Sequence, residues 1–258
     1  MTPARPADGI AWITGASAGI GRAVALRLLQ DGWTVAVTAR RAGELAALAA
    51  LHPGRIIPVA GDVTDAAQMA AAVAQAEAVA GKPIALAILN AGTYVPMSAQ
   101  DFDSAAFKLQ VDVNLIGTGN ALAAVMPGLI ARGRGQLAIV ASVAGYRGLP
   151  TAIAYAATKA ALIAMAESLK FDLDRAGVLM HVINPGFVRT PLTDKNTFPM
   201  PFLIEADDAA NRIVRGLHHT AFEIAFPRRF AAILKLLRIL PYWLFFRLVA
   251  RGTRGATG

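Results

Sequence analysis

Residues 10–22 read IAWITGASAGIGR, an apolar run that leads into glycines at positions 15, 19 and 21. The apolar residues predict a strand over 9–14 that is buried on both faces of a sheet. Glycines spaced G-x-x-x-G-x-G permit a tight turn and let the backbone approach a pyrophosphate at the start of the helix expected over 19–31. The stretch therefore indicates a nucleotide-binding strand–helix unit. The alternative is a tight turn that holds no ligand.

The same alternation of strand and helix continues along the chain. It predicts an α/β fold with a doubly wound parallel sheet of the Rossmann type, in about seven strands. We expect one domain over 1–226 and a C-terminal amphipathic helical tail over 227–258. The expected strands are 9–14, 33–38, 55–60, 84–90, 136–142, 178–184 and 222–226, and the expected helices are 19–31, 42–51, 65–80, 104–132, 152–176 and 205–218.

Composition excludes several classes of protein. With 258 residues, 55% hydrophobic and only 16% charged, the chain is not intrinsically disordered. It contains no cysteine, which excludes disulfides, cysteine-based zinc sites and thiol catalysis. We see no signal peptide, no simple membrane-spanning run and no cluster with metal-ligand spacing, so we expect a cytoplasmic protein without a metal.

The net charge of +8 is concentrated at the C-terminus. Seven of the 25 Lys and Arg residues, and none of the 17 Asp and Glu residues, lie after residue 223. The body of the protein is therefore close to neutral, and the basic character belongs to the tail. Nucleic-acid binding is not expected, because groove-reading and base-stacking patterns are missing.

The end of the second expected strand distinguishes between nicotinamide cofactors. Folds that bind NAD usually place an acidic residue there for the ribose 2′-hydroxyl. This chain reads Thr38-Ala39-Arg40-Arg41 instead. Because a guanidinium suits bidentate contact with phosphate, we predict NADP, with NADPH preferred over NADH and Arg40 on the 2′-phosphate. Arg41 or Arg22 is expected to assist; solvated charges at a helix start are the alternative.

Four polar residues form the candidate catalytic set. Tyr155 and Lys159 are i and i+4 on an expected helix and share a face. A buried ammonium near a phenol is expected to lower the pKa of Tyr155, which proton transfer to a carbonyl oxygen needs. Ser142 ends the fifth strand and can stabilise a developing oxyanion. Asn114 lies inside the helix expected over 104–132, where it predicts a kink or a bound water.

Taken together, these motifs resemble the short-chain dehydrogenase/reductase family over residues 9–226. The motifs that carry the resemblance occur in order: Thr14–Gly21, Asp62-Val63, Asn90-Ala91-Gly92, Asn114, Ser142, Tyr155-x-x-x-Lys159 and Pro185-Gly186.

The resemblance implies an enzyme that interconverts a carbonyl and an alcohol by hydride transfer, as a homo-oligomer. Tyr155 would be the general acid/base, Ser142 would orient the carbonyl, Lys159 would hold the nicotinamide ribose, and Asn114 would hold a water of a proton relay. The residues implied in cofactor binding are Gly15, Ser17, Gly19, Ile20, Gly21, Arg40, Arg41, Asp62, Val63, Asn90, Ala91, Gly92, Tyr155, Lys159, Pro185, Gly186, Val188 and Thr190.

The resemblance also implies a lid over the nicotinamide at about 187–218. Its first part reads FVRTPLTDKNTFPMPFL over 187–203, which is rich in apolar residues. An apolar lid favours an apolar or lipid-like substrate. The alternative is that these side chains only pack the lid onto the body.

The tail over 228–251 combines arginines with Trp, Phe and Leu, a composition typical of helices that lie on a membrane. The sequence leaves open whether it contacts a membrane surface, the catalytic body or a second subunit. Two alternative functions also remain: a non-enzymatic dinucleotide-binding scaffold, and a membrane-surface adaptor on the same fold.

Overall fold

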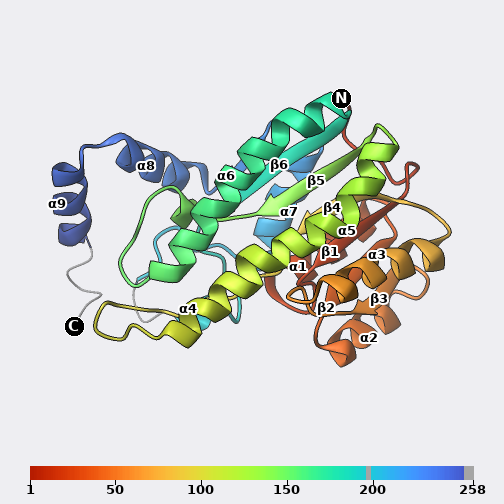
Figure 1. Ribbon diagram of the computed structural model, residues 1–258, viewed down its shortest axis with the longest axis horizontal. Coiled ribbons are helices and arrows are strands. Elements are labelled where there is room, and N and C mark those ends of the chain that lie inside the picture. The colour runs from red at the N-terminus through yellow and green to blue at the C-terminus, as the bar shows by residue number, and fades with distance from the viewer. Residues whose placement is uncertain (196–198, 253–258) are drawn as a thin grey trace.

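The computed structural model describes residues 1–195 and 199–252. All seven expected strands form, and they make one parallel sheet in the order β3-β2-β1-β4-β5-β6-β7 (Figure 1). The order reverses between β1 and β4, as in a doubly wound sheet, so the predicted fold class is confirmed. The strands are β1 Ile10–Thr14, β2 Val35–Ala39, β3 Ile56–Ala60, β4 Ile84–Leu89, β5 Gly135–Val140, β6 Val178–Pro185 and β7 Glu223–Phe226.

Helices cover both faces of the sheet. One face carries α1, α2 and α7, and the other carries α3, α5 and α6, each face with its own buried apolar cluster. Strands enclosed in this way are apolar nearly throughout, which is why the sequence shows short continuous apolar runs. The helices of the body are α1 Gly19–Gln30, α2 Ala42–Leu51, α3 Ala66–Ala80, α4 Ser104–Val111, α5 Gly117–Ala131, α6 Ile153–Arg175 and α7 Ala206–Leu217.

The helix expected over 104–132 is interrupted. A π-helical turn, Asp112–Ile116, separates α4 from α5 and contains Asn114, whose carbonyl accepts a hydrogen bond from the Thr118 hydroxyl at 2.7 Å. Wide turns of this kind often mark functional sites. The combined helix is long and apolar enough to cross a membrane, but α5 packs on α3 and β4 as a core helix does.

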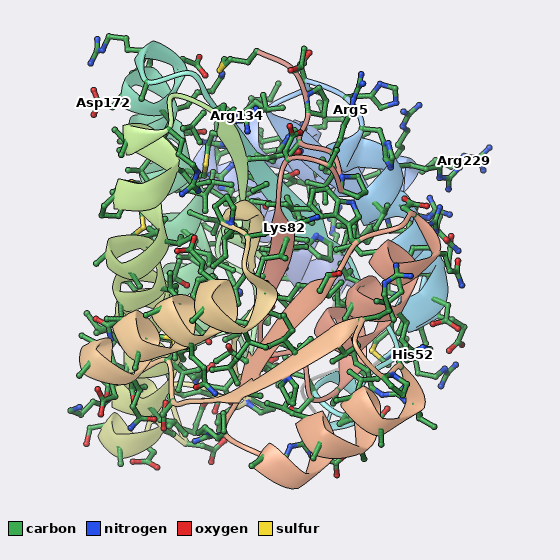
Figure 2. The ribbon with its side chains drawn as sticks, turned by 90° about the vertical axis from the view of Figure 1, so that its right-hand side faces the viewer. Arg5, His52, Lys82, Arg134, Asp172 and Arg229 are labelled. Atoms are coloured by element: carbon green, nitrogen blue, oxygen red, sulfur yellow. The ribbon has the colours of Figure 1, made fainter. Side chains whose placement is uncertain are left out.

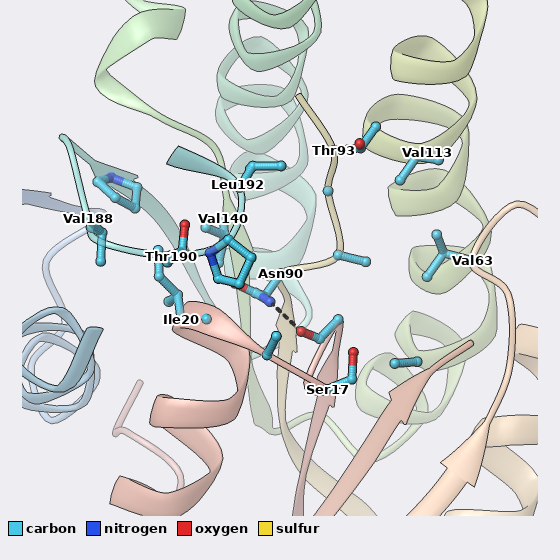
Figure 3. A pocket seen from close by; sticks show the side chains of 18 of the residues that line it. Ser17, Ile20, Val63, Asn90, Thr93, Val113, Val140, Val188, Thr190 and Leu192 are labelled. Atoms are coloured by element: carbon cyan, nitrogen blue, oxygen red, sulfur yellow. Dashed lines mark hydrogen bonds between the residues drawn. The ribbon is translucent and has the colours of Figure 1, made fainter. Parts of the chain in front are cut away.

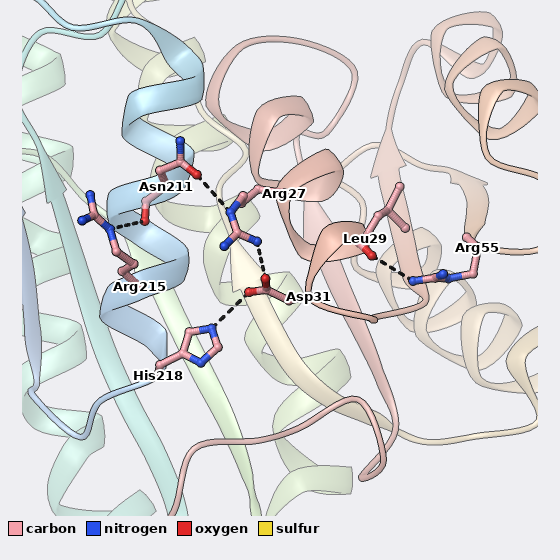
Figure 4. A network of polar contacts seen from close by, with 7 residues as sticks. All are labelled: Arg27, Leu29, Asp31, Arg55, Asn211, Arg215 and His218. Carbon is pink, nitrogen blue, oxygen red and sulfur yellow. Dashed lines mark hydrogen bonds and ion pairs between the residues drawn. The ribbon is translucent and has the colours of Figure 1, made fainter.

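A polar network joins α1 to α7 on the first face (Figure 4). The Arg27 side chain donates to Asn211 at 2.9 Å and also pairs with Asp31, which lies 3.1 Å from the His218 ring. Burial alone would raise the pKa of Asp31, but the hydrogen bonds from Arg27 and His218 outweigh it and lower that pKa. The network ties the first crossover helix to the last one before β7.

Two helices form the predicted C-terminal tail, α8 Arg228–Ile239 and α9 Tyr242–Gly252, with Pro241 between them. They lie at one end of the molecule (Figure 1). Ala231 and Leu234 of α8 belong to the same buried cluster as α3, α5 and α6. In the structure α8 therefore packs into the core of the body. The predicted domain boundary at 226 rests on composition alone and stays a prediction.

Gly145 lies in the short 3-10 turn Val143–Gly145 after β5 and tests how closely this turn packs on α6. A Cβ there would lie 2.7 Å from the backbone carbonyl of Lys159, so we expect Gly145→Ala to push the turn off α6 and destabilise the protein by about 1–3 kcal/mol. Gly148→Ala is the matched control, because a Cβ at Gly148 meets nothing within 4 Å. Urea unfolding measures both, and equal midpoints would contradict the packing described.

Candidate active site

The loops that follow β1 to β6 enclose one cleft at the carboxyl edge of the sheet, where the strand order reverses (Figure 3). Its volume is about 480 Å³. Ligands of doubly wound folds bind at this position. The sequence-predicted residues that line the cleft are Gly15, Ser17, Gly19, Ile20, Arg40, Arg41, Asp62, Val63, Asn90, Ala91, Gly92, Ser142, Tyr155, Lys159, Pro185, Gly186, Val188 and Thr190.

Three predicted residues do not line the cleft. Gly21 lies beneath it, where a Cβ would come 2.5 Å from both the Gly15 carbonyl and the Asn90 amide. Gly21 therefore lets the loop pack closely on Asn90, and its contact with a cofactor stays a prediction. Arg22 is exposed outside the cleft, and Asn114 is fully buried behind it.

Asn90 joins the ends of the two central strands. Its side-chain amide donates to the carbonyls of Thr14 and Gly15 at 3.1 and 3.2 Å. The Thr14 hydroxyl in turn accepts from the backbone N–H groups of Asn90 and Ala91 at 3.0 and 3.1 Å. Gly15, at a φ of 70°, has no space for a side chain, because a Cβ would lie 2.7 Å from the Ala91 Cα. These contacts hold the glycine loop against β4.

Two arginines stand at the far end of the cleft, directly after β2. Arg40 and Arg41 are both exposed, and the Arg41 guanidinium donates to the Ser17 hydroxyl of the glycine loop at 3.0 Å. The neighbouring Asp62 does not pair with either, since its carboxylate accepts from the backbone and hydroxyl of Thr64. A group with several negative charges fits between the arginines and the glycine loop.

Tyr155 and Ser142 stand at the other end. A hydrogen bond joins the two side chains, and Tyr94 packs edge-on against the Tyr155 ring at a centroid distance of 5.1 Å. Burial raises the pKa of Tyr155 to about 12, and the hydrogen bond from Ser142 only partly offsets it. The sequence-based expectation of a lowered pKa is therefore wrong for the protein by itself, because desolvation of the phenolate outweighs the stabilising contacts.

Lys159 is buried between β5 and α6, with only 3% of its surface exposed. Its ammonium donates to the Val140 carbonyl at 2.9 Å and lies 5.6 Å from the centre of the Tyr155 ring. Burial lowers the pKa of Lys159 to about 8, because no carboxylate compensates the charge.

Asn114 positions the backbone around this end of the cleft. Its amide oxygen accepts from Thr93 N at 2.7 Å, and its amide nitrogen donates to the Thr93 carbonyl and to the Thr158 hydroxyl. A Cβ on Gly92 would lie 3.3 Å from the Asn114 amide oxygen and 3.6 Å from the Lys159 ammonium. The Asn114 amide oxygen and the Lys159 ammonium thus both lie close to Gly92. The water expected between them stays a prediction.

The segment after β6 borders the cleft through Val188, Thr190 and Leu192 (Figure 3). Beside it, the Phe230 ring of α8 packs on Phe187 and Phe202 at centroid distances of 5.6 and 5.8 Å. The predicted lid over 187–218 includes residues 196–198, which lie outside the described part of the chain. Phe187 and Phe202 form, with Phe230 of the tail, an apolar wall next to the cleft. Residues 206–217 of the predicted lid instead form α7, which packs on α1 in the body and does not line the cleft.

Sequence reasoning missed several residues that shape the site. Thr158 donates to the Tyr155 carbonyl and links Asn114 to α6, a role that its position beside Lys159 could have suggested. Arg147, between Ser142 and Tyr155, reaches the carbonyls at the end of α8. No local pattern signals that contact, because its partners are about 90 residues away.

Comparison with known proteins agrees with this geometry. Residues 9–199 match the family described as short chain dehydrogenase. The chain belongs to this family. An uncharacterized oxidoreductase of Myxococcus xanthus is 38% identical over 238 residues, covering 91% of this chain and 94% of the relative.

Two further relatives carry names that mention a cofactor. A 2-dehydro-3-deoxy-L-rhamnonate dehydrogenase (NAD(+)) of a Sphingomonas species is 34% identical and covers 74% of this chain and 76% of its own length. The crystal structure of a short chain dehydrogenase from Burkholderia cenocepacia in complex with NADP has a TM-score of 0.83 and 27% identity, and covers 95% of this chain and 99% of its own. As a short-chain dehydrogenase, the chain is an oxidoreductase of a family that uses a nicotinamide dinucleotide.

The buried Lys159 makes stability depend on pH. Its folded-state pKa of about 8 lies below the ordinary 10.5, so the unfolded chain holds the proton more tightly and stability rises between those two pH values. Lys159→Met removes this dependence. We expect the unfolding free energy of the wild type relative to Lys159→Met to rise by about 3 kcal/mol between pH 7 and 10.5.

Urea unfolding without added nucleotide at several pH values measures this difference. The exposed Lys82 supplies the control, since Lys82→Met is expected to keep the pH dependence of the wild type. A Lys159→Met profile parallel to that of the wild type would show that Lys159 is not held at a depressed pKa.

Proposed function

We propose that the protein is an NADP(H)-dependent reductase that converts an apolar carbonyl compound to its alcohol, with Tyr155 as the proton donor. One observation carries the proposal: one cleft has two guanidiniums without a carboxylate partner among the described residues at one end, and the Ser142, Tyr155 and Lys159 side chains at the other. The glycine loop between them accommodates a pyrophosphate.

Preference for the phosphorylated cofactor rests on the residues after β2. The names of the relatives do not decide the question, since one names NAD(+) and one structure holds NADP. In this chain the two residues directly after β2 are Arg40 and Arg41, so no acidic residue stands at the position that usually binds a ribose 2′-hydroxyl. The contact of Arg41 with Ser17 holds one guanidinium over the glycine loop, where a 2′-phosphate would add a charged partner.

The cofactor, when bound, supplies the hydride that reduces the carbonyl carbon. Tyr155 gives the proton to the carbonyl oxygen, and its raised pKa keeps the phenol protonated throughout the neutral range. Ser142 donates to the same oxygen and stabilises the charge that develops there. Lys159, charged below about pH 8, lies beside Tyr155 and stabilises the phenolate left after the transfer.

An apolar substrate fits the part of the cleft that Val188, Pro191 and Leu192 line. Phe187 and Phe202 pack on Phe230 next to the segment that borders the cleft, and Tyr94 packs on Tyr155 itself. The described residues at this end offer no cation other than the buried Lys159. A charged carbonyl compound would thus lose its hydration without gaining a partner.

Cofactor preference is tested by charge reversal after β2. We expect Arg40→Asp to lower kcat/KM with NADPH roughly 10- to 100-fold, since a charge-assisted contact with phosphate is lost, and to spare the value with NADH. Arg22→Gln, outside the cleft, is the matched control and should leave the NADPH to NADH ratio unchanged. A wild type that prefers NADH would refute the assignment.

Tyr155→Phe tests the proton donor. The variant keeps the ring and its packing on Tyr94 but loses the hydroxyl, so we expect ketone reduction to fall by at least about 100-fold while NADPH still binds. Fluorescence titration with NADPH and a ketone screen from short to long chains measure the two properties. Full turnover in Tyr155→Phe would contradict the mechanism, and a wild type inactive on all ketones would favour the scaffold.

The homo-oligomer implied by the family stays a prediction. Several apolar side chains of α4, α5 and α6 are exposed, including Leu109, Ile130 and Phe171, and would be covered by a second copy. Light scattering on the purified protein measures the mass directly.

A further inference from the structure

The C-terminal tail exposes an apolar surface that the described residues of the body do not cover. This surface, here called the tail face, is formed by side chains whose exposed fraction lies between 49% and 77%: Ile233, Leu236 and Ile239 of α8, and Tyr242, Trp243 and Phe246 of α9. Residues 233, 236 and 239 are three apart and share one side of α8. An exposed apolar group of this size marks an interaction site.

The other side of each helix is fixed to the body. Leu234 and Phe245 are 7% and 3% exposed, and the Lys235 ammonium pairs with Glu223 of β7. The Arg147 guanidinium donates to the carbonyls of Leu237 and Leu240 at 2.6 and 2.7 Å, and it lies 3.9 Å from the centre of the Phe245 ring. A cation is well placed at the C-terminal end of a helix. The tail face is therefore displayed by helices whose opposite sides are anchored.

The two helices of the tail face also carry exposed arginines and no acidic residue. These arginines are Arg228, Arg229, Arg238, Arg247 and Arg251, and no Asp or Glu occurs from 224 to 258. Arg229 points away from the body into solvent (Figure 2). A two-fold contact between copies would bring these like charges together, which opposes self-association through this surface. The charge is complementary to anionic lipid headgroups.

We propose that the tail face lies on an anionic membrane surface. Trp and Tyr prefer the interface between headgroups and acyl chains, and aliphatic side chains enter it more deeply. The arginines beside them remain in the headgroup layer, where each adds electrostatic attraction. The tail contains all of these side chains on two short helices, as interfacial anchors do.

The docking would also bring the cleft near the bilayer. Phe230 of α8 packs on Phe187 and Phe202, which follow the strand end that borders the cleft. A membrane on the tail face therefore adjoins the apolar wall of the site, and a carbonyl compound dissolved in the bilayer is the substrate class that reaches it. This second step rests on the proposed reductase function.

Vesicle sedimentation of the full chain tests the docking. The wild type is expected to sediment with vesicles of phosphatidylcholine that contain phosphatidylglycerol, less at high salt, and weakly with pure phosphatidylcholine. The double variant Trp243→Glu/Phe246→Glu should bind at least about tenfold more weakly, because two interfacial side chains become charged. Leu51→Glu is the matched control: Leu51 is 67% exposed on α2, away from the tail, and its substitution should leave binding unchanged.

Two outcomes would overturn the docking: a wild type that stays in solution with anionic vesicles, and a double variant that binds as the wild type does. If the double variant instead lowers the mass measured by light scattering while neither protein binds vesicles, the tail face is an interface between copies. Circular dichroism checks the folding of the double variant and of the control, and we expect both to be folded because the substituted positions are exposed.

Ketone reduction separates the second step from the first. With a long-chain ketone dissolved in anionic vesicles, the double variant should show a KM raised several-fold, while kcat/KM for a short soluble ketone stays that of the wild type. Equal KM values for the vesicle-borne ketone would refute delivery from the bilayer. If the wild type reduces neither ketone, the reductase proposal fails, and sedimentation still decides the docking by itself.

Discussion

The loops after β1 and β4 approach each other so closely that only glycine and a precisely bonded asparagine fit between them. Gly15 abuts the Cα of Ala91, and Asn90 holds the carbonyls of Thr14 and Gly15. This approach occurs where the strand order reverses, so the loops on either side diverge and leave the cleft open. Arg40 and Ser142 follow β2 and β5, the strands that pair with β1 and β4, so their positions depend on that edge. Tyr155 and Lys159 reach the same cleft from α6.

Desolvation governs the chemistry at the reactive end. Burial raises the pKa of Tyr155 and lowers that of Lys159, so both groups are driven towards their neutral forms. A neutral phenol is the form that gives a proton to a carbonyl, and an ammonium with a lowered pKa remains charged up to about pH 8. These are the protonation states that the proposed reduction needs at neutral pH. Keeping Lys159 charged in the interior lowers the stability of the fold.

Local patterns in the sequence predicted the strands, the glycine loop and the residues at the strand ends, because parallel sheets bring those ends to one edge. They failed where several long-range effects compete. A kink at Asn114 is predicted, but its bonds to Thr93 and Thr158 are not, and the pKa of Tyr155 depends on its enclosure and not on its spacing from Lys159. The anchoring of the tail through Arg147 joins segments about 90 residues apart, a contact without a local signal.

A crystal structure of the protein with NADPH tests the central claim most directly, since the claim is that one cleft spans from the arginines after β2 to Tyr155. The account predicts the 2′-phosphate within hydrogen-bonding distance of Arg40 or Arg41, the pyrophosphate on the glycine loop between Gly15 and Gly21, and the nicotinamide beside Tyr155 and Lys159. A 2′-phosphate in solvent, with both guanidiniums turned away, would contradict the assigned cofactor. A nicotinamide outside the reach of Tyr155 would contradict the assigned chemistry.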